Sequence, residues 1–359
     1  MKIKDICTSV TDGSHNPPLG IEKSEYMMLS SKNIFDDEIT FDEPRFLTER
    51  DFEKEHRRTK IAVGDVLFTI VGTVGRIAVV DEDMPTFALQ RSVAVLHPKN
   101  DVCLPRFLMY ALRGKRTYIE NRAKGVAQKG IYLKEVSDID IHIPDISNQE
   151  IIINKLDKVN AIIKLRQKEL LVLDNFIKAR FVEMFGDPIR NTQNRPTTEF
   201  INVVRMQRGF DLPVQDRQQD GKIPVYGSNG VLDHHNVAKI QGGGVITGRS
   251  GTIGKVFYTE GDYWPLNTSL FSVDTHGNNV IYLAYLLQLF NLTRFVEGTG
   301  VPTLNRNMFH NKQIIDAPIE EQNQFADFVH QVDKSKFAVQ KTLEQTQTLF
   351  DSLMQKYFG

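Results

Sequence analysis

The sequence predicts an α+β fold with two globular domains separated by an antiparallel two-helix coiled coil and related by an internal pseudo-two-fold repeat. Three observations predict it. Several motifs occur twice at a nearly constant spacing along the 359 residues, a long segment without proline or glycine carries a helical apolar stripe, and the other segments mix short β-branched runs with Gly and Pro turns. Since a repeat of this length exceeds a solenoid unit, it indicates a duplicated domain and a function that needs two similar surfaces.

The repeat has several landmarks. A glycine-rich strand–turn motif, a short polar loop and the entry to a long helix each appear once in either half of the chain, at offsets between 179 and 173 residues. The repeated pairs are residues 66–76 with 245–255, 89–92 with 266–269, Pro144 with Pro318, Gln149 with Gln322, and 185–186 with 358–359.

The chain is predicted to divide into four segments in the order domain, helix, domain, helix. The first domain occupies residues 1–147, the first long helix 148–187, the second domain 188–318 and the second long helix 319–359. In each domain, strands flank a glycine turn whose glycines supply positive φ angles. The predicted elements are strands at 63–70, 76–80, 245–247 and 255–258, and helices at 105–112 and 282–287.

Two long amphipathic helices are predicted by apolar side chains at 3-4 spacing, which in the first helix extend over five heptads. That helix would be roughly 55 Å long. Each stripe needs a partner, and two such helices in one chain provide each other with one. We expect an antiparallel pair with the domains at opposite ends, and the alternative is that each helix packs only on its own domain. The stripes comprise Ile152, Leu156, Val159, Ile163, Leu170, Leu173, Ile177 and Met184, then Phe325, Val329, Val332, Val339, Leu343, Phe350, Leu353 and Tyr357, with Arg166, Arg180, Lys336 and Thr346 as interruptions.

Composition bounds the class of protein. Hydrophobic residues make up 41% and charged residues 25%, which is typical of globular proteins. No apolar run approaches the roughly 20 residues of a membrane span, and the N-terminus has no apolar core of a secretory signal. Cys7 and Cys103 form neither a disulfide framework nor a zinc knuckle. We therefore expect a cytoplasmic protein.

The net charge of −1 argues against a protein that coats nucleic acid by bulk charge, although it leaves room for a local basic face. Two basic stretches, residues 54–60 and 106–129, are candidates for such a face. Solvated helix surfaces explain such runs equally well.

Motifs for catalysis are weak. Asn16 and the two prolines after it are similar to a loop of adenine methyltransferases, but Leu19 stands where an aromatic residue would stack on a flipped base. Residues 248–255 depart from the phosphate-loop spacing. Residues 233–235 (Asp-His-His) lack the further carboxylates of a metal phosphoesterase site. We therefore predict no catalytic and no metal-binding residue.

The polar loops, among them residues 11–16 and 208–211, carry the candidate DNA-binding residues, because Arg, Gln, Asn, Ser and Lys pair with base edges and phosphates. The halves keep one scaffold while the loop chemistry changes, as in 90–91 (Gln-Arg) against 267–268 (Asn-Thr). This is expected if each half reads a different short target. The candidates are Ser14, His15, Asn16, Gln90, Arg91, Lys124, Gln128 and Lys129 in the first half, and Ser228, Asn229, Arg249, Ser250, Asn267, Thr268, Thr303, Asn305 and Arg306 in the second.

Four segments resemble the specificity subunit of type I DNA restriction-modification enzymes. Residues 11–18 and 223–230 resemble openings of that family's recognition domains, 248–254 resembles their shared core turn, and 318–322 resembles the entry to their spacer helix. The resemblance covers essentially the whole chain, and the order of domains and helices makes it specific.

The resemblance implies two target-recognition domains at the ends of an antiparallel coiled coil. Each domain would read one half of a bipartite, asymmetric site in double-stranded DNA, and the coil would set the gap. The chain itself would hold no cofactor and perform no chemistry. Two methyltransferase subunits docked on the spacer helices would bring S-adenosylmethionine, and motor-nuclease restriction subunits would bring ATP and Mg²⁺. No membrane partner is expected.

Two other functions remain open at this stage. A DNA-modifying enzyme similar to an adenine methyltransferase would use Asn16 or residues 233–235. A coiled-coil adaptor would present two interaction domains without binding DNA.

Overall fold

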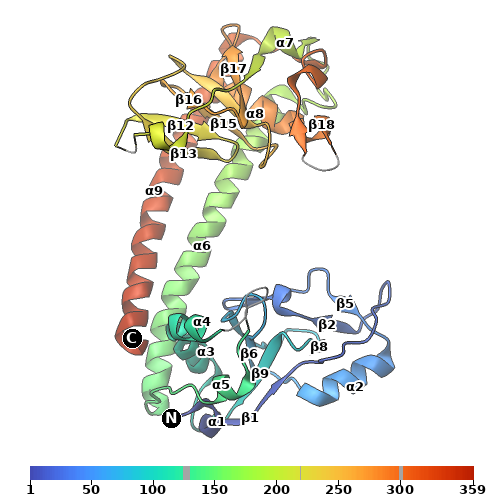
Figure 1. The fold of residues 1–359 in the computed structure, drawn as a ribbon, viewed down its shortest axis with the longest axis vertical. Helices are drawn as coiled ribbons and strands as arrows, with labels where there is room; N and C mark the ends of the chain where they lie inside the picture. Colours follow the sequence, from blue (N-terminus) through green and yellow to red (C-terminus); the bar gives the residue numbers. More distant parts are fainter. Residues whose placement is uncertain (124–129, 219, 299–301) are drawn as a thin grey trace. The chain divides into compact units, whose positions relative to one another are not determined.

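A computed structural model of the protein describes residues 1–123, 130–218, 220–298 and 302–359. The chain forms two compact units, each of which contains one α+β domain and parts of both long helices (Figure 1). The first unit consists of Met1–Leu165 and Leu343–Gly359, and the second consists of Arg166–Thr342.

The domain of the first unit is built on a four-stranded antiparallel sheet in the order β1-β9-β6-β7. Its central strand β6 is buried on both faces: Val66 and Phe68 pack with helix α3, while Leu67 packs with a second sheet, β5-β2-β8. The strands are β1 Cys7–Asp12, β2 Met27–Leu29, β3 Ile34–Phe35, β4 Glu38–Ile39, β5 Arg45–Phe46, β6 Val66–Thr69, β7 Ile77–Val79, β8 Phe87–Leu89 and β9 Val93–Pro98; the helices are α1 Ile3–Ile6, η1 Ser31–Asn33, α2 Glu49–Thr59, α3 Pro105–Gly114, α4 Arg116–Arg122 and α5 Leu133–Ser137.

The domain of the second unit repeats this plan with a sheet in the order β11-β17-β14-β15 and a smaller sheet β13-β12-β16. On β14, Val245 packs with helix α8 and Ile246 packs with Tyr226 of β12. The strands are β10 Thr197–Glu199, β11 Arg205–Arg208, β12 Ile223–Gly227, β13 Gly230–His235, β14 Gly244–Gly248, β15 Val256–Thr259, β16 Trp264–Pro265, β17 Ser269–Asp274, β18 Val296–Glu297, β19 Thr303–Leu304 and β20 Gln313–Ile315; the helices are α7 Phe200–Val203, η2 Val214–Asp216, α8 Val280–Phe290, η3 Leu292–Phe295 and η4 Arg306–Met308.

The matching strand orders confirm the predicted internal repeat. Helices α3 and α8 correspond to the predicted helices at 105–112 and 282–287, and α3 begins at Pro105 as expected for a proline that needs no hydrogen-bond donor in the first turn. The insertions differ between the copies, since α2 in the first domain has no helical counterpart between β12 and β14 in the second.

The long helices α6 (Ile146–Phe185) and α9 (Ile319–Phe358) run antiparallel. In the first unit the N-terminal part of α6 shares a core with the C-terminal part of α9, through Leu156 and Phe350. In the second unit the C-terminal part of α6 meets the N-terminal part of α9, through Phe181 and Phe325. The predicted helix pair is therefore confirmed, and the alternative in which each helix packs only on its own domain is wrong.

Charged residues that interrupt the apolar stripe are paired. The ammonium of Lys336 on α9 lies 2.6 Å from Asp174 on α6 and 3.4 Å from Asp333. Burial lowers the pKa of Lys336, but the two carboxylates outweigh this effect and hold that pKa above its ordinary value. On α6 itself, Arg166 and Arg180 each pair with a glutamate three residues on.

A buried glutamine fastens each domain to a long helix. In the first unit Gln149, fully buried near the start of α6, accepts a hydrogen bond from the Leu104 amide at the start of α3 (2.9 Å). Its side-chain amide donates to the carbonyls of Val102 and Pro144, both at 2.9 Å. The side chain thereby satisfies backbone groups at the joint that would otherwise be buried without partners.

Gln322 makes the same joint in the second unit. It is 1% exposed near the start of α9 and accepts from the amide of Asn279, the residue that caps α8 (2.9 Å). It donates to the side chain of Asn278 (2.7 Å) and to the carbonyl of Ala317 (2.8 Å). The sequence landmark shared by Gln149 and Gln322 is therefore a repeated structural joint.

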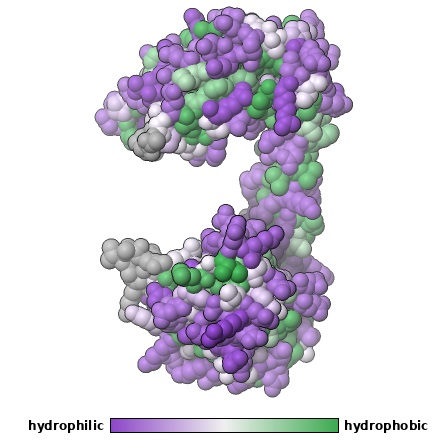
Figure 2. Space-filling model, turned by 90° about the vertical axis from the view of Figure 1, so that its right-hand side faces the viewer, coloured by the Kyte–Doolittle hydropathy of each residue, from purple (hydrophilic) through white to green (hydrophobic). Residues whose placement is uncertain are grey.

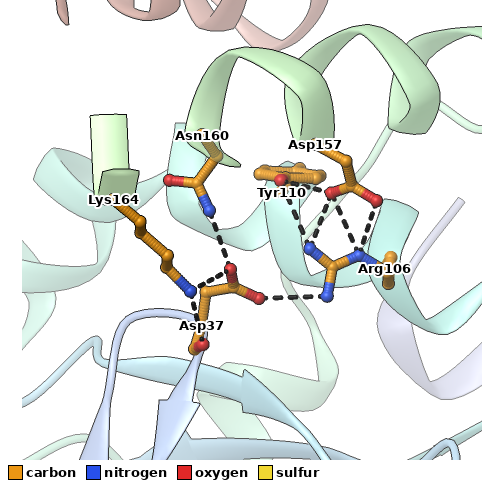
Figure 3. A network of polar contacts seen from close by, with 6 residues as sticks. All are labelled: Asp37, Arg106, Tyr110, Asp157, Asn160 and Lys164. Atoms are coloured by element: carbon orange, nitrogen blue, oxygen red, sulfur yellow. Dashed lines mark hydrogen bonds and ion pairs between the residues drawn. The ribbon is translucent and has the colours of Figure 1, made fainter. Parts of the chain in front are cut away.

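A polar network adds a second attachment in the first unit (Figure 3). Arg106 of α3 lies between two carboxylates, 3.0 Å from Asp37 at the tip of the β3–β4 hairpin and 2.6 Å from Asp157 of α6. Asn160 and Lys164, one and two turns along α6, bind the other oxygen of Asp37 at 2.7 and 2.8 Å. The network thus connects α3, the hairpin and α6.

The network alters the protonation equilibrium of Asp37. Burial raises the pKa of this carboxyl, but the hydrogen bond from Lys164 and the charge of Arg106 together outweigh burial and hold the pKa below its ordinary value. Because the folded state binds the proton of Asp37 less readily than the unfolded state, the ionised carboxylate stabilises the fold at neutral pH.

We predict that Gln149→Ala destabilises the first unit by about 2–3 kcal/mol, because it leaves the Leu104 amide and two carbonyls buried without partners. Urea unfolding combined with hydrogen exchange at the start of α3 measures this effect. The matched control is Gln167→Ala at an exposed position of the same helix, which should change stability by less than about 0.5 kcal/mol. Equal losses in both variants would contradict the role of the joint.

We predict that Asp37→Asn destabilises the first unit by about 2 kcal/mol at pH 7. Since the folded pKa is depressed, this contribution is complete above the ordinary carboxyl pKa and disappears as the pH falls through the folded value. Urea unfolding between pH 7 and pH 3 should therefore show the difference between wild type and variant shrinking on acidification. Asp83→Asn, at an exposed position, should show no such trend, and a pH-independent difference for Asp37→Asn would refute the assignment.

Candidate functional site

A buried threonine and a positive-φ glycine hold the shared glycine turn in both domains, although the two threonines stand one position apart in the repeat. In the first, the buried Thr69 hydroxyl accepts from the Arg76 amide (2.9 Å) and closes the turn between β6 and β7. In the second, the equally buried Thr247 hydroxyl donates to the carbonyl of Lys255 (2.9 Å). The last glycine of each turn has φ near +90°, at 93° and 91°, which confirms the expected positive-φ hairpin.

A polar loop crosses beside this turn, and its backbone corrects the predicted alignment of the two copies. The amide of Arg91 donates to the carbonyl of Ser14 (2.9 Å), and the amide of Asn267 donates to the carbonyl of Phe210 (2.9 Å). Arg91 is therefore equivalent to Asn267, an offset of 176 rather than 177. The prediction that set 90–91 against 267–268 was wrong by one residue, since a Leu-x-x-Ser pattern in both loops suggested a register that the backbone does not adopt.

A third segment completes the site in each domain. The amide of Ile131 donates to the carbonyl of Ile70 (2.9 Å), and the amide of Leu304 donates to that of Arg249 (2.8 Å). Bridges also pair residue 71 with 130 and residue 250 with 303. Residues 130–133 and 303–306 are consequently equivalent, although the sequence shows no likeness between them.

A pocket lies where these segments meet in the first domain. Its volume is about 350 Å³. At its edge Asp12 is buried, forms an ion pair with Arg58 of α2 (3.0 Å) and is hydrogen-bonded to His15 (2.8 Å), so both of its carboxylate oxygens have partners. The lining residues are Asp12, His15, Ile70, Val71, Arg91, Gly130, Ile131, Tyr132 and Leu133.

The second domain carries a pocket of about 310 Å³ at the equivalent place. It contains three arginines, none of which forms an ion pair among the described residues. Arg208 donates from its Nε to the carbonyl of Asn267 (3.3 Å), which leaves its remaining N–H groups available. The lining residues are Arg208, Arg249, Leu270, Glu297, Thr303, Leu304, Asn305 and Arg306.

The two pockets share a backbone and differ in chemistry. Glycines 13 and 209 mark the equivalence, because in each case an added Cβ would lie within 2.3 Å of a carbonyl oxygen of the crossing loop. The three arginines of the second pocket therefore replace an aspartate, an isoleucine and a leucine of the first. The equivalent pairs are Asp12 with Arg208, Ile70 with Arg249, and Leu133 with Arg306.

The structure brings four of the five described first-domain candidates together. Ser14 and Gln90 form a backbone bridge, and His15 and Arg91 line the pocket beside them. Asn16 lies outside this group in an exposed loop. Lys124, Gln128 and Lys129 lie outside the described residues.

In the second domain, Arg249, Thr303, Asn305 and Arg306 line the pocket. Ser250 pairs with residue 303 through a backbone bridge, and the Thr268 carbonyl accepts from the amides of residues 249 and 250. Two candidates are already engaged: the Asn229 side chain accepts from Lys255, and the Asn267 side chain donates to Asp211. Ser228 adjoins the glycine turn, since an added Cβ at residue 248 would lie 2.8 Å from its carbonyl oxygen.

The basic stretch 106–129 is largely structural where it is described. Arg106 and Arg116 form ion pairs with Asp37 and Asp36, and Arg113 lies 4.8 Å from the ring centroid of Phe350 on α9. These cations stabilise the fold, in keeping with the alternative of ordinary helix surfaces.

The possible catalytic motifs do not assemble. Leu19 beside the two prolines is 91% exposed, and Asp233 is paired with Arg217 at 3.6 Å. Among the described residues no group of three or more His, Cys, Asp or Glu side chains could hold a metal ion. Within the same part of the chain, no helix combines the length and apolarity needed to cross a membrane.

The candidate list left out three residues at the pockets, namely Asp12, Arg58 and Arg208, although they lie in the polar segments 11–16 and 208–211 and in the basic stretch 54–60. Asp12 and Arg208 both precede a close-approach glycine, which is a usable signal, but their offset of 196 differs from that of the other landmarks. Arg58 belongs to the inserted helix α2 and has no counterpart. The face of each domain that Figure 2 shows is mostly hydrophilic with small apolar patches.

The chain thus contains one domain twice on paired helices, and one pocket position carries a different set of side chains in each copy. Comparison with known proteins specifies the family. Residues 1–175 and 191–346 match the family described as type I restriction modification DNA specificity domain. The chain belongs to this family and contains two copies of its domain.

Relatives agree with this assignment. The chain is 27% identical over 160 residues to the EcoBI specificity subunit of a type I restriction enzyme from Escherichia coli; the match covers 44% of this chain and spans about a third (32%) of that relative's length. The S subunit of a type I restriction-modification system from M. genitalium has a similar fold, with a TM-score of 0.61 and 15% identity over 100% of this chain and 95% of that one. A second similar fold comes from a structure that concerns complex assembly and conformational transition of the type I R-M system. Its TM-score is 0.55 and its sequence identity is 15%, over 100% of this chain and 96% of that one. The role of this family is DNA specificity and not catalysis.

Proposed function

We propose that each domain reads one half of a bipartite, asymmetric DNA site and that the paired helices set the unread gap. The observation that carries the proposal is the pair of equivalent pockets, in which three arginines replace an aspartate, an isoleucine and a leucine. A protein that read two identical half-sites would have no reason to differ at these positions. Different side chains on one backbone are what two different target sequences require.

The long helices support the role of a spacer. Each contains 40 residues without a break, which corresponds to about 60 Å, and each is fastened to a domain by a buried glutamine. A domain that is fixed to a helix cannot drift along the DNA independently of it. The length of the helix pair would then determine how many base pairs separate the half-sites.

The helices also present a surface suited to partner subunits. Leu165, Leu171 and Val172 of α6 and Phe337 of α9 are more than half exposed, although apolar residues on helix surfaces are commonly covered. We assign this surface to two methyltransferase subunits, which would bring S-adenosylmethionine. Motor-nuclease restriction subunits with ATP and Mg²⁺ would join that complex.

The net charge of −1 fits a subunit that relies on its partners for attraction to phosphate. The isolated chain should therefore bind DNA weakly and with strong dependence on salt, and tight binding at high salt without partners would contradict this view.

We predict that Gln90→Ala combined with Arg91→Ala relaxes recognition at one half-site and leaves the other unchanged. The change removes direct base contacts in only one domain, where each is worth about 1–3 kcal/mol of discrimination. Protection of DNA by the complex of the chain with a methyltransferase subunit measures the effect on variant half-sites.

The reciprocal control is Asn267→Ala, at the equivalent position of the second domain, which should relax only the other half-site. Equal changes at both half-sites would rule out independent reading. A complex that protects no specific sequence would favour the adaptor alternative, and methyl transfer by the chain alone, lost in Asn16→Ala, would favour the enzyme alternative.

We predict that removing one heptad from both helices, residues 165–171 and 339–345, shortens the gap by about three base pairs, since seven residues span about 10 Å and each base pair about 3.4 Å. Both deletions lie on the same side of the Asp174–Lys336 pair and preserve the apolar register. Binding to sites of graded gap length measures the change. Deletion from α6 alone breaks the register and serves as the control. An unchanged preferred gap in the double deletion would show that the helices are not the spacer.

A further inference from the structure

We propose that the arginine pocket of the second domain, formed by Arg208, Arg249 and Arg306, reads guanine in that domain's half-site. This inference rests on the proposed function and deepens it by naming the base class. Arg208, which lies in the polar segment 208–211 but was not among the candidate DNA-binding residues, is the new specificity-determining residue.

The pocket carries a concentrated positive charge. Three guanidinium groups line one recess of about 310 Å³, and the one acidic residue beside them, the exposed Glu297, forms no ion pair with them among the described residues. Arg249 and Arg306 are half-buried, so holding them together without a counter-ion is unfavourable. A ligand rich in hydrogen-bond acceptors would relieve this repulsion.

The geometry of the guanidinium group indicates which acceptor the pocket would bind. Its planar fork matches the O6 and N7 acceptors of guanine, and this is the commonest specific contact in protein–DNA recognition. Arg208 is held by its Nε on the carbonyl of Asn267, so its outer nitrogens are positioned rather than free to rotate. Thr303 and Asn305 add further polar groups at the edge of the same recess.

A backbone phosphate would offer hydrogen-bond acceptors too. Comparison of the two domains distinguishes a phosphate from a guanine base as the ligand of the arginines. Phosphate contacts position a protein without reading sequence, so both domains would need them alike. At the equivalent positions the first domain instead has Asp12, already paired with Arg58, together with Ile70 and Leu133. The arginines therefore occur where the two domains differ, which is expected of base reading.

The test uses the complex of the chain with a methyltransferase subunit and duplexes that carry its site. The half-site unaffected by Gln90→Ala with Arg91→Ala belongs to the second domain. In wild type, replacing one guanine of that half-site by 7-deazaguanine, which lacks N7, should weaken binding about tenfold. The variants Arg208→Ala, Arg249→Ala and Arg306→Ala should bind the unmodified duplex more weakly than the wild type does. In these variants, replacing the guanine by 7-deazaguanine should weaken binding only slightly further.

Two controls define the alternatives. Arg205→Ala, on the same strand as Arg208 and outside the pocket, should leave the guanine dependence intact. Arg→Lys at the three positions should retain general affinity but lose discrimination. If the alanine variants lose affinity equally for all sequences and lysine restores that affinity, the pocket is a phosphate site and guanine reading is overturned. A half-site of the second domain that contains no G·C pair would also overturn guanine reading. Those results leave the bipartite function standing, whereas a complex without any split specificity would overturn both.

Discussion

The buried glutamine at the start of each long helix is the interaction on which the architecture depends. Gln149 and Gln322 each satisfy one amide at the beginning of a domain helix and two acceptors at the domain–helix junction. Because an amide side chain with no water around it must find all its partners in the protein, the joint admits one orientation. Each domain is thereby fixed to the part of the long helix that belongs to its own unit.

Duplication then allows one chain to hold two unlike sites. The crossing loop and the third segment make the same backbone hydrogen bonds in both domains, and the last glycine of the turn has nearly the same positive φ in each, so the scaffold is constant. Side chains that project from this scaffold into the pockets differ, and aspartate at position 12 against arginine at position 208 reverses a charge. A constant backbone with variable side chains permits a change of target without a change of fold, which suits a family defined by DNA specificity.

The sequence predicted what depends on local pattern. The long helices followed from 3-4 spacing, the turn from its glycines and the duplication from repeated motifs. Several pocket residues were among the candidates, and the pairing of 70 with 249 followed from the repeat. The equivalence of 12 with 208 and of 133 with 306 did not, because only backbone hydrogen bonds between distant segments reveal it. The one-residue error at 267–268 has the same origin: residue types matched in one register while the strands paired in another. Lys336 appeared as a defect in the stripe, and its partner Asp174 lies on the other helix.

The central claim is that one chain reads two different short sequences across a gap set by its helices. A chromosomal methylation map, recorded with and without this protein in cells that contain the methyltransferase subunit, tests it most directly. The account predicts an asymmetric motif of two specific parts separated by a constant number of unread base pairs, present only when the protein is present. A contiguous motif, a palindromic motif with identical halves, or a map that does not depend on the protein would contradict it.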